Sequence, residues 1–153
     1  MDNFLGRIFD SRAIKLNLDS KTKETAFVEL IDGIAAINPE CNRTEMLAAI
    51  CKREEKINTG IGGCVAIPHA YCRGIGRMTG AIGISQDGID YGALDNKPVN
   101  IIFLIGMSEQ ADENHLRILN ILFKLARSDA AALLKNAKNV QDIQEILSRV
   151  PIQ

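Results

Sequence analysis

The feature that most constrains the fold is a nearly continuous apolar run over residues 99–106, in which Asn100 is the one polar side chain. A strand with one solvated face alternates apolar and polar residues, whereas a strand covered on both faces is apolar throughout. Residues 64–67 and 80–85 give further strand signals, and residues 14–18 alternate like a half-exposed strand. These patterns predict an α/β fold with a central mixed β-sheet and helices on both sides.

Capping residues and apolar periodicity predict two helices in the first third of the chain. Asp19 or Ser20 can cap the first helix. Apolar residues recur in it at helical spacing, at Ala26, Leu30, Ile34 and Ile37. Asn42, with Glu45 three residues later, resembles a capping box and opens a second helix that reaches about Lys56.

The second half of the chain is predicted to turn at residues 86–88 and then to become helical after the apolar run. A long helix begins at Asp112 and Glu113, because acidic side chains are favoured at a helix N-terminus. One stripe of this helix carries His115, Leu119, Leu122 and Ala126. Two short helices are predicted around residues 130–137 and 141–149.

Size and charge limit the possible functions. The 153 residues suffice for one core, and we expect a single domain over residues 1–153. A net charge of -1 argues against nucleic acid as a partner, because phosphate backbones require clustered Lys and Arg. No apolar run approaches the ~20 residues of a membrane span, and the first residues lack the layout of a signal peptide. We therefore expect a cytoplasmic protein without membrane insertion.

A glycine-rich stretch leads into the strand at residues 64–67 and ends at Pro68 and His69, one of only two histidines in the chain. Proline has a fixed φ and no N–H, so we expect the His69 ring at an edge of the sheet, where α/β proteins place their chemistry. Gly62 and Gly63 allow two interpretations: a flexible turn, or bare backbone N–H groups that approach an anion near His69.

Common cofactor and metal motifs do not fit this stretch. The glycines precede a strand, lack the third glycine of a dinucleotide fingerprint, and are not part of a G-K-[ST] loop, so neither NAD nor ATP is indicated. Cys64, His69 and Cys72 lie close enough in sequence to consider zinc, but their spacing matches no common zinc motif. We expect no metal, no cofactor and reduced cysteines.

Arg53 and His115 are the residues that could assist His69. Arg53 lies along the edge of an apolar helix stripe, where its stem could cover the core or its guanidinium could grip a phosphate or carboxylate. His115 lies on a core-facing stripe and, taken alone, is typical of a buried structural histidine. Two imidazoles and one guanidinium together suit a phosphoryl group carried on nitrogen, because neutral imidazole is a nucleophile.

These residues resemble the phosphohistidine signature of the fructose/mannitol-type enzyme IIA (EIIA) proteins of the bacterial sugar phosphotransferase system. The resemblance implies the mannitol-type IIA fold, with His69 as the phosphorylated residue and Arg53 and His115 in support. Cys64, Ala70 and Ser108 depart from the residues most common in the family and bear on the partner surface. The matching stretches are residues 53–54, 58–62, 65–70, 90–95 and 97–99, and the pair His115-Leu116.

By the same resemblance, the phosphate donor is the histidine phosphocarrier HPr or its nitrogen-branch counterpart. We expect a free-standing IIA-like module, which favours a nitrogen-regulatory IIA whose phosphorylation state other proteins read. The alternatives are a sugar-specific IIA that passes phosphate to a separate IIB, and a binding module that has lost phosphotransfer. We expect the partner to dock on an apolar patch near His69 that includes Ile61, Ile67 and Ile75.

Overall fold

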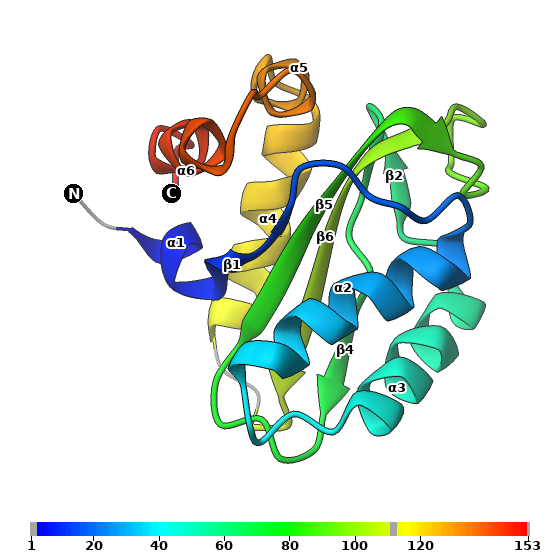
Figure 1. The fold of residues 1–153 in the computed structure, drawn as a ribbon, viewed down its shortest axis with the longest axis vertical. Coiled ribbons are helices and arrows are strands. Elements are labelled where there is room, and N and C mark those ends of the chain that lie inside the picture. The colour runs from blue at the N-terminus through cyan, green and yellow to red at the C-terminus, as the bar shows by residue number, and fades with distance from the viewer. Residues whose placement is uncertain (1–2, 111–112, 153) are drawn as a thin grey trace.

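The computed structural model describes residues 3–110 and 113–152 and has a six-stranded sheet at its centre (Figure 1). The strands are β1 (Phe9–Lys15), β2 (Gly60–Gly62), β3 (Val65–Ala66), β4 (His69–Cys72), β5 (Thr79–Ile89) and β6 (Val99–Ser108). Their order is β1-β5-β6-β3-β2, and β4 also pairs with β6. Because β6 runs antiparallel to β5 and parallel to β3 and β4, the predicted mixed sheet is confirmed.

Helices cover both faces of this sheet, as the sequence predicts. The helices are α1 (Phe4–Ile8), α2 (Lys23–Ile37), α3 (Arg43–Lys56), α4 (Glu113–Ala126), α5 (Ala130–Lys135) and α6 (Val140–Ser148). α2 and α3 lie together on one face, and α4 crosses the other face with α1, α5 and α6 beside it (Figure 1). Each face therefore has its own apolar core.

The apolar run of β6 serves both cores. Phe103 and Ile105 belong to the core that contains the buried side chains of α4, whereas Ile102 and Leu104 belong to the core beneath α2 and α3. Burying an apolar side chain of this size contributes roughly 1.5–3 kcal/mol, so both faces of β6 stabilise the fold. This two-sided burial is the reason that the run is apolar at consecutive positions.

The strand that the sequence predicts over residues 64–67 is shorter in the structure, and a second strand follows Pro68. β3 precedes Pro68 and β4 follows it, and both run parallel to β6. Pro68 has no N–H to donate, but its carbonyl accepts the N–H of Ile105 at 2.9 Å and holds the chain against β6. β4 is absent from the sequence prediction. It makes His69 the first residue of a strand paired with β6 instead of a residue beyond a strand end.

Three other strand predictions need correction. The strand expected over residues 14–18 is β1, which begins earlier at Phe9 and ends at Lys15 after pairing with β5. The glycines expected to form a turn are in part a strand, β2, which pairs antiparallel with β3. Residues 86–88 are an irregularity within β5, where Gly88 has a φ of +84° and pairing resumes between Ile89 and Val99.

The N-terminus of α2 lies beyond both predicted caps. Thr22 caps this helix, since its hydroxyl oxygen accepts the backbone N–H of Thr25 at 3.2 Å. The backbone N–H groups of Asp19 and Ser20 donate instead to the carboxylate of Glu29, at 3.2 and 3.0 Å. The two residues predicted as helix caps from local sequence are therefore held by the tertiary contact with Glu29 instead.

The remaining helices follow the predictions closely. Asn42 caps α3 by accepting the N–H of Glu45 at 3.0 Å, and α4, α5 and α6 lie close to the predicted ranges. α1 is an additional short helix, and the predicted role of Asp112 concerns a residue outside the described ones. Among the helices of the described residues, none combines the length and the apolar character that a membrane crossing requires.

Candidate functional site

A hollow of about 720 Å³ brings together the two histidines and the arginine singled out from the sequence. His69 comes from the start of β4, Arg53 from the end of α3 and His115 from the first turn of α4. These segments are distant in sequence and meet because β4 pairs with β6 between the helices. Other residues of its lining are Lys52, Lys56, Tyr71, Met107, Leu116 and Leu119.

The His69 ring is oriented by the backbone just before it. Its Nδ1 atom lies 2.7 Å from the carbonyl oxygen of Ile67. A carbonyl oxygen can only accept a hydrogen bond, so the proton of this contact belongs to Nδ1. In a neutral imidazole with Nδ1 protonated, Nε2 keeps an unshared electron pair and can act as a nucleophile.

The surroundings of His69 favour this neutral form. Burial lowers the pKa of His69 below its ordinary value of 6.5, and the positive charge of Arg53 acts in the same direction. The hydrogen bond to Ile67 and the carboxylate of Glu54 raise the pKa but do not outweigh burial. His69 is therefore unprotonated at Nε2 under neutral conditions.

Arg53 gives the hollow a fixed positive charge. One of its guanidinium nitrogens, Nη1, donates to the carbonyl of Ile57 at 3.0 Å, at the C-terminal end of α3. A guanidinium carries five N–H donors, so this bond anchors the group and leaves donors that can bind an anion. Lys52 and Lys56 line the same hollow from the same helix. This side of the hollow is consequently strongly basic.

His115 lies deeper than the other two residues. Its side chain is buried, with 6% exposure, and its ring centroid is 5.1 Å from that of Tyr71. Within the described residues its Nδ1 atom has no hydrogen-bond partner. Because a buried polar nitrogen without a partner is costly, a ligand that bonds to this imidazole would gain stability.

A buried network behind the hollow supports the chain that carries His69. The Glu54 carboxylate, 7% exposed, accepts the backbone N–H of Thr59 at 3.0 Å and its hydroxyl at 2.6 Å. Lys23 lies 3.3 Å from the same carboxylate. The carbonyl of Thr59 accepts the N–H of Ile67 at 3.0 Å. A continuous set of contacts thus runs from Glu54 through Thr59 and Ile67 to His69.

Comparison with protein families identifies the family of this chain over nearly its full length. Residues 7–150 match the family described as "Phosphoenolpyruvate-dependent sugar phosphotransferase system, EIIA 2". The chain belongs to this family. It is accordingly a phosphotransfer component of that system, and the resemblance drawn from the residues around His69 is confirmed.

Relatives of this EIIA chain are of two kinds. It is 33% identical over 138 residues to the fructose-specific EIIA component of Haloferax volcanii, with 90% of each protein covered. It is 27% identical over 133 residues to the nitrogen regulatory protein of Pseudomonas aeruginosa, with 86% of each covered. It is also 33% identical over 143 residues to the fructose-specific EIIABC component of Bacillus subtilis, but spans only 22% of that protein.

Solved structures agree with the fold of the EIIA family. The nitrogen regulatory protein IIA-Ntr of Neisseria meningitidis has a TM-score of 0.82 and 26% identity, over 94% of this chain and 99% of that one. The IIA mannitol structure of Escherichia coli has a TM-score of 0.74 and 16% identity, over 90% of this chain and 96% of that one. The predicted mannitol-type IIA fold is confirmed.

In this EIIA chain the glycines lie apart from the two histidines. Gly62 and Gly63 have φ angles of +90° and +64°, and the N–H of Gly63 donates to the carboxylate of Asp95 at 3.2 Å. Neither glycine lines the hollow that contains His69. The structure thus brings together three of the five residues expected to act on phosphate and leaves the two glycines elsewhere.

The cysteines of this EIIA chain are free thiols, and Cys64 and Cys72 lie in different surroundings. Cys72 is buried, and burial raises the pKa of its thiol to about 11. Cys64 lines a different hollow from His69, together with Asp95. Over residues 3–110 and 113–152, no group of three or more His, Cys, Asp or Glu residues is placed to hold a metal ion.

The apolar patch predicted for docking is wrong in two of its three residues. Ile67 and Ile75 are buried in the cores, with 1% and 6% exposure. The exposed apolar side chains that line the hollow are Tyr71 and Leu116, at 55% and 70% exposure. Sequence signals existed for both: Tyr71 follows His69 at the period-two spacing of a strand, and Leu116 follows His115 directly.

Proposed function

We propose that His69 accepts a phosphoryl group at Nε2 from the phosphohistidine of an HPr-like protein and later passes it on. The observation that carries this proposal is the contact between Nδ1 and the carbonyl of Ile67, which directs reactivity to Nε2. The new P–N bond forms at Nε2 as the P–N bond of the donor histidine breaks, and the donor nitrogen keeps the electron pair. Because both bonds join phosphorus to imidazole, the transfer is reversible.

Arg53 and His115 have supporting roles in this proposal. The negative charge of the transferred group spreads over its oxygens, and cations and N–H donors already in place stabilise it without reorganising. Arg53 offers a fork of donors that suits phosphate, and the buried imidazole of His115 can donate a hydrogen bond. All groups required by the proposal come from the chain itself, so we assign no cofactor or metal.

We propose HPr, or its nitrogen-branch counterpart, as the donor, and the cytosol as the place of exchange. The four free cysteines are typical of a reducing compartment. Tyr71 and Leu116, exposed beside the hollow, provide an apolar surface from which a docked protein would exclude water. The basic residues Lys52 and Lys56 lie on the same rim.

For the biological role we propose a nitrogen-regulatory type of IIA, since IIA-Ntr of Neisseria meningitidis superimposes with a TM-score of 0.82 over 94% of this chain. A sugar-specific role, with transfer to a separate IIB, is a second candidate. It is favoured by the 33% identity to the fructose-specific EIIA component of Haloferax volcanii.

Intact-mass measurement tests the central proposal. The protein is incubated with phosphoenolpyruvate, enzyme I and HPr, and we expect the mass of one phosphoryl group that is lost in acid and kept in alkali. His69→Ala should abolish the gain, whereas His115→Ala, the matched histidine control, should gain phosphate slowly. Full phosphorylation of His69→Ala would refute the proposal.

A second assay separates the two candidate roles. The phosphorylated protein is mixed with a purified fructose-type or mannitol-type IIB domain, and phosphate on each protein is followed by mass. We expect no rapid transfer to IIB for a regulatory IIA. Rapid and complete transfer would instead assign the sugar-specific role.

A further inference from the structure

Tyr71 connects the strand that carries His69 with the helix that carries His115. It lies two residues after His69 in β4, and side chains at this spacing point to the same face of a strand. The centroid of its ring is 5.1 Å from that of the His115 imidazole, and the two ring planes meet at 58°. All three side chains line the same hollow. β4 and α4 are thus in contact beside His69 through the two rings of Tyr71 and His115.

The geometry of this contact is that of an attractive aromatic pair. Aromatic rings favour tilted arrangements with centroids about 4.5–7 Å apart, because the positive edge of one ring meets the negative face of the other. The distance and the tilt between Tyr71 and His115 both satisfy this condition. The attraction depends on the angle between the rings, so it restrains the orientation of the imidazole.

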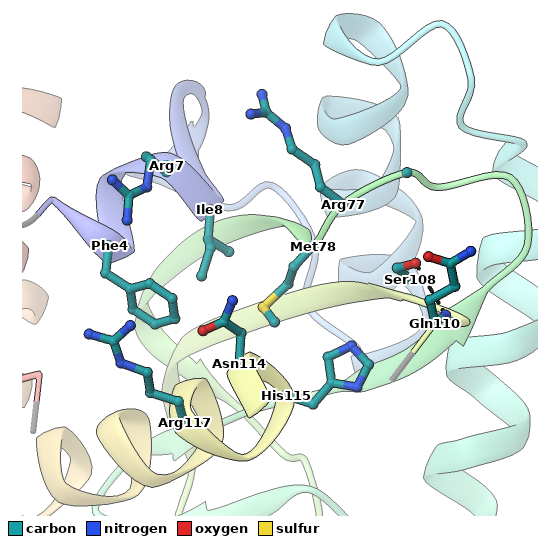
Figure 2. A pocket seen from close by; sticks show the side chains of 11 residues that line it. Phe4, Arg7, Ile8, Arg77, Met78, Ser108, Gln110, Asn114, His115 and Arg117 are labelled. Carbon is teal, nitrogen blue, oxygen red and sulfur yellow. Dashed lines mark hydrogen bonds between the residues drawn. The ribbon is translucent and has the colours of Figure 1, made fainter. Parts of the chain in front are cut away.

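His115 is bordered by open space on two sides, which makes such a restraint valuable. It lines the hollow that contains His69 and also a second hollow of about 400 Å³. Figure 2 shows the His115 ring on the side of the second hollow near Ser108 and Gln110. Its Nδ1 atom has no hydrogen-bond partner within the described part of the chain. No hydrogen bond from those residues therefore fixes the ring through Nδ1, and the orientation depends on ring packing.

Exposure differs sharply between the two rings. Tyr71 is 55% exposed, whereas His115 is only 6% exposed. The outer ring of the pair therefore shields the inner one from water. A hydrogen bond that an imidazole donates to a phosphoryl oxygen is stronger where water is excluded and the donor is already oriented.

We propose that Tyr71 is a positioning residue for phosphate transfer, because its ring orients the imidazole of His115 and shields it from water. The effect on transfer rests on the function proposed above for His69 and His115. The aromatic ring carries this role, since the contact joins the two rings. Tyr71 lies just beyond residues 65–70, the stretch that resembles the family signature, so the signature does not assign this role.

Single-turnover transfer from phosphorylated HPr, measured over a range of HPr concentrations, separates positioning from docking. Tyr71→Leu keeps an apolar side chain at the hollow but removes the ring. Loss of one aromatic pair corresponds to a ~2- to 10-fold change in rate, so we expect the rate at saturating HPr to fall about fivefold. Tyr71→Phe should restore most of this rate. Phe123→Leu is the matched control, since Phe123 is 38% exposed on α4 and does not line the hollow.

A double-mutant cycle tests whether Tyr71 acts through His115. In a His115→Ala background, Tyr71→Leu should slow transfer little further, because the ring that it positions is already absent. A full additional loss in that background overturns the proposal. So does an effect of Tyr71→Leu on the half-saturating HPr concentration alone, which would assign the residue to docking.

Proton NMR of the unphosphorylated protein tests the contact without any transfer. We expect nuclear Overhauser effects between the Tyr71 and His115 rings, and His115 ring signals that shift and broaden in Tyr71→Leu but not in Tyr71→Phe or Phe123→Leu. Unchanged His115 signals in Tyr71→Leu would show that Tyr71 does not hold the imidazole. If His69 accepted no phosphate at all, the function proposed above would fail, while these spectra would still decide whether Tyr71 orients His115.

Discussion

The carbonyl oxygen of Ile67 lies 2.7 Å from Nδ1 of His69, two residues further along the chain. This contact keeps the proton on Nδ1 and the electron pair on Nε2. We therefore predict that the phosphoryl group is attached to Nε2. Two-dimensional ¹H–¹⁵N NMR of the phosphorylated protein distinguishes the two nitrogens by their couplings to the ring protons. Attachment at Nδ1 would mean that the bond to Ile67 breaks before transfer.

The lowered pKa of His69 predicts how acid affects transfer. Because the charged ring is disfavoured in the folded protein, Nε2 stays available below the ordinary pKa of 6.5. We expect the rate of phosphate acceptance, with donor phosphorylation controlled, to decline with falling pH with a midpoint below 6.5. The shift of the His69 ring proton in NMR should follow the same curve. A midpoint at or above 6.5 would contradict the prediction.

The lowered pKa of His69 also makes the free energy of unfolding depend on pH. Below pH 6.5 the unfolded chain protonates His69 while the folded protein resists protonation, so this group lowers the free energy of unfolding as the pH falls towards the folded pKa. Above 6.5 it contributes no pH dependence. Urea unfolding of the wild-type protein and of His69→Asn should show a smaller acid slope in the variant.

Glu54 and its neighbour Glu55 make a matched pair for testing the buried network. Glu54 accepts hydrogen bonds from Thr59 and lies against Lys23, whereas Glu55 is exposed. Glu54→Gln loses hydrogen bonds to a charged group and leaves a cation poorly compensated, so we expect a loss of roughly 1.5–3 kcal/mol in denaturant unfolding. Glu55→Gln should change stability by less than about 0.5 kcal/mol. Equal values for both variants would show that the network does not stabilise the fold.

The sheet and most helices could be predicted because their signals are local or periodic. The apolar run of β6 reflects burial on both faces, and Asn42 caps α3 through an interaction within one turn. Errors in the predicted helix and strand boundaries arise where contacts with residues distant in sequence determine where an element begins or ends. Glu29 binds the backbone at Ser20 and moves the start of α2 to Lys23, and β6 extends the pairing past Pro68 into β4. Local sequence does not contain these partners.

The residues of the candidate site also differ in whether local sequence or distant contacts determine their role. Residue type and motif single out His69, Arg53 and His115, and the sheet brings them into one hollow. For the glycines the sequence leaves two interpretations, a flexible turn or backbone N–H groups that approach an anion, because small residues permit close approach. In the structure, Gly63 instead donates to Asp95, which is distant in sequence. A positive φ and a long-range acceptor cannot be inferred from spacing alone.

Arg53 should be necessary for rapid transfer. Removing a preorganised donor from a site where charge develops slows a reaction by ~10²-fold or more, and we expect this loss for Arg53→Ala. The measurement is the initial rate of phosphorylation by charged HPr. Arg43→Ala is the control on the same helix, because Arg43 pairs with Asp32 at the far end of α3. An unchanged rate in Arg53→Ala would mean that its stem merely covers the core.

Gly63 should be required for folding and not for phosphate binding. Its φ of +64° is rarely adopted by other residues, and a Cβ atom there would overlap the backbone carbonyl oxygen of Ala126 at the end of α4. Gly63→Ala should therefore lower the free energy of unfolding by roughly 1–3 kcal/mol. Gly76→Ala is the matched control, because a Cβ atom at Gly76 meets nothing within 4 Å. If Gly63→Ala kept wild-type stability but failed to accept phosphate, the glycine would belong to the phosphate site after all.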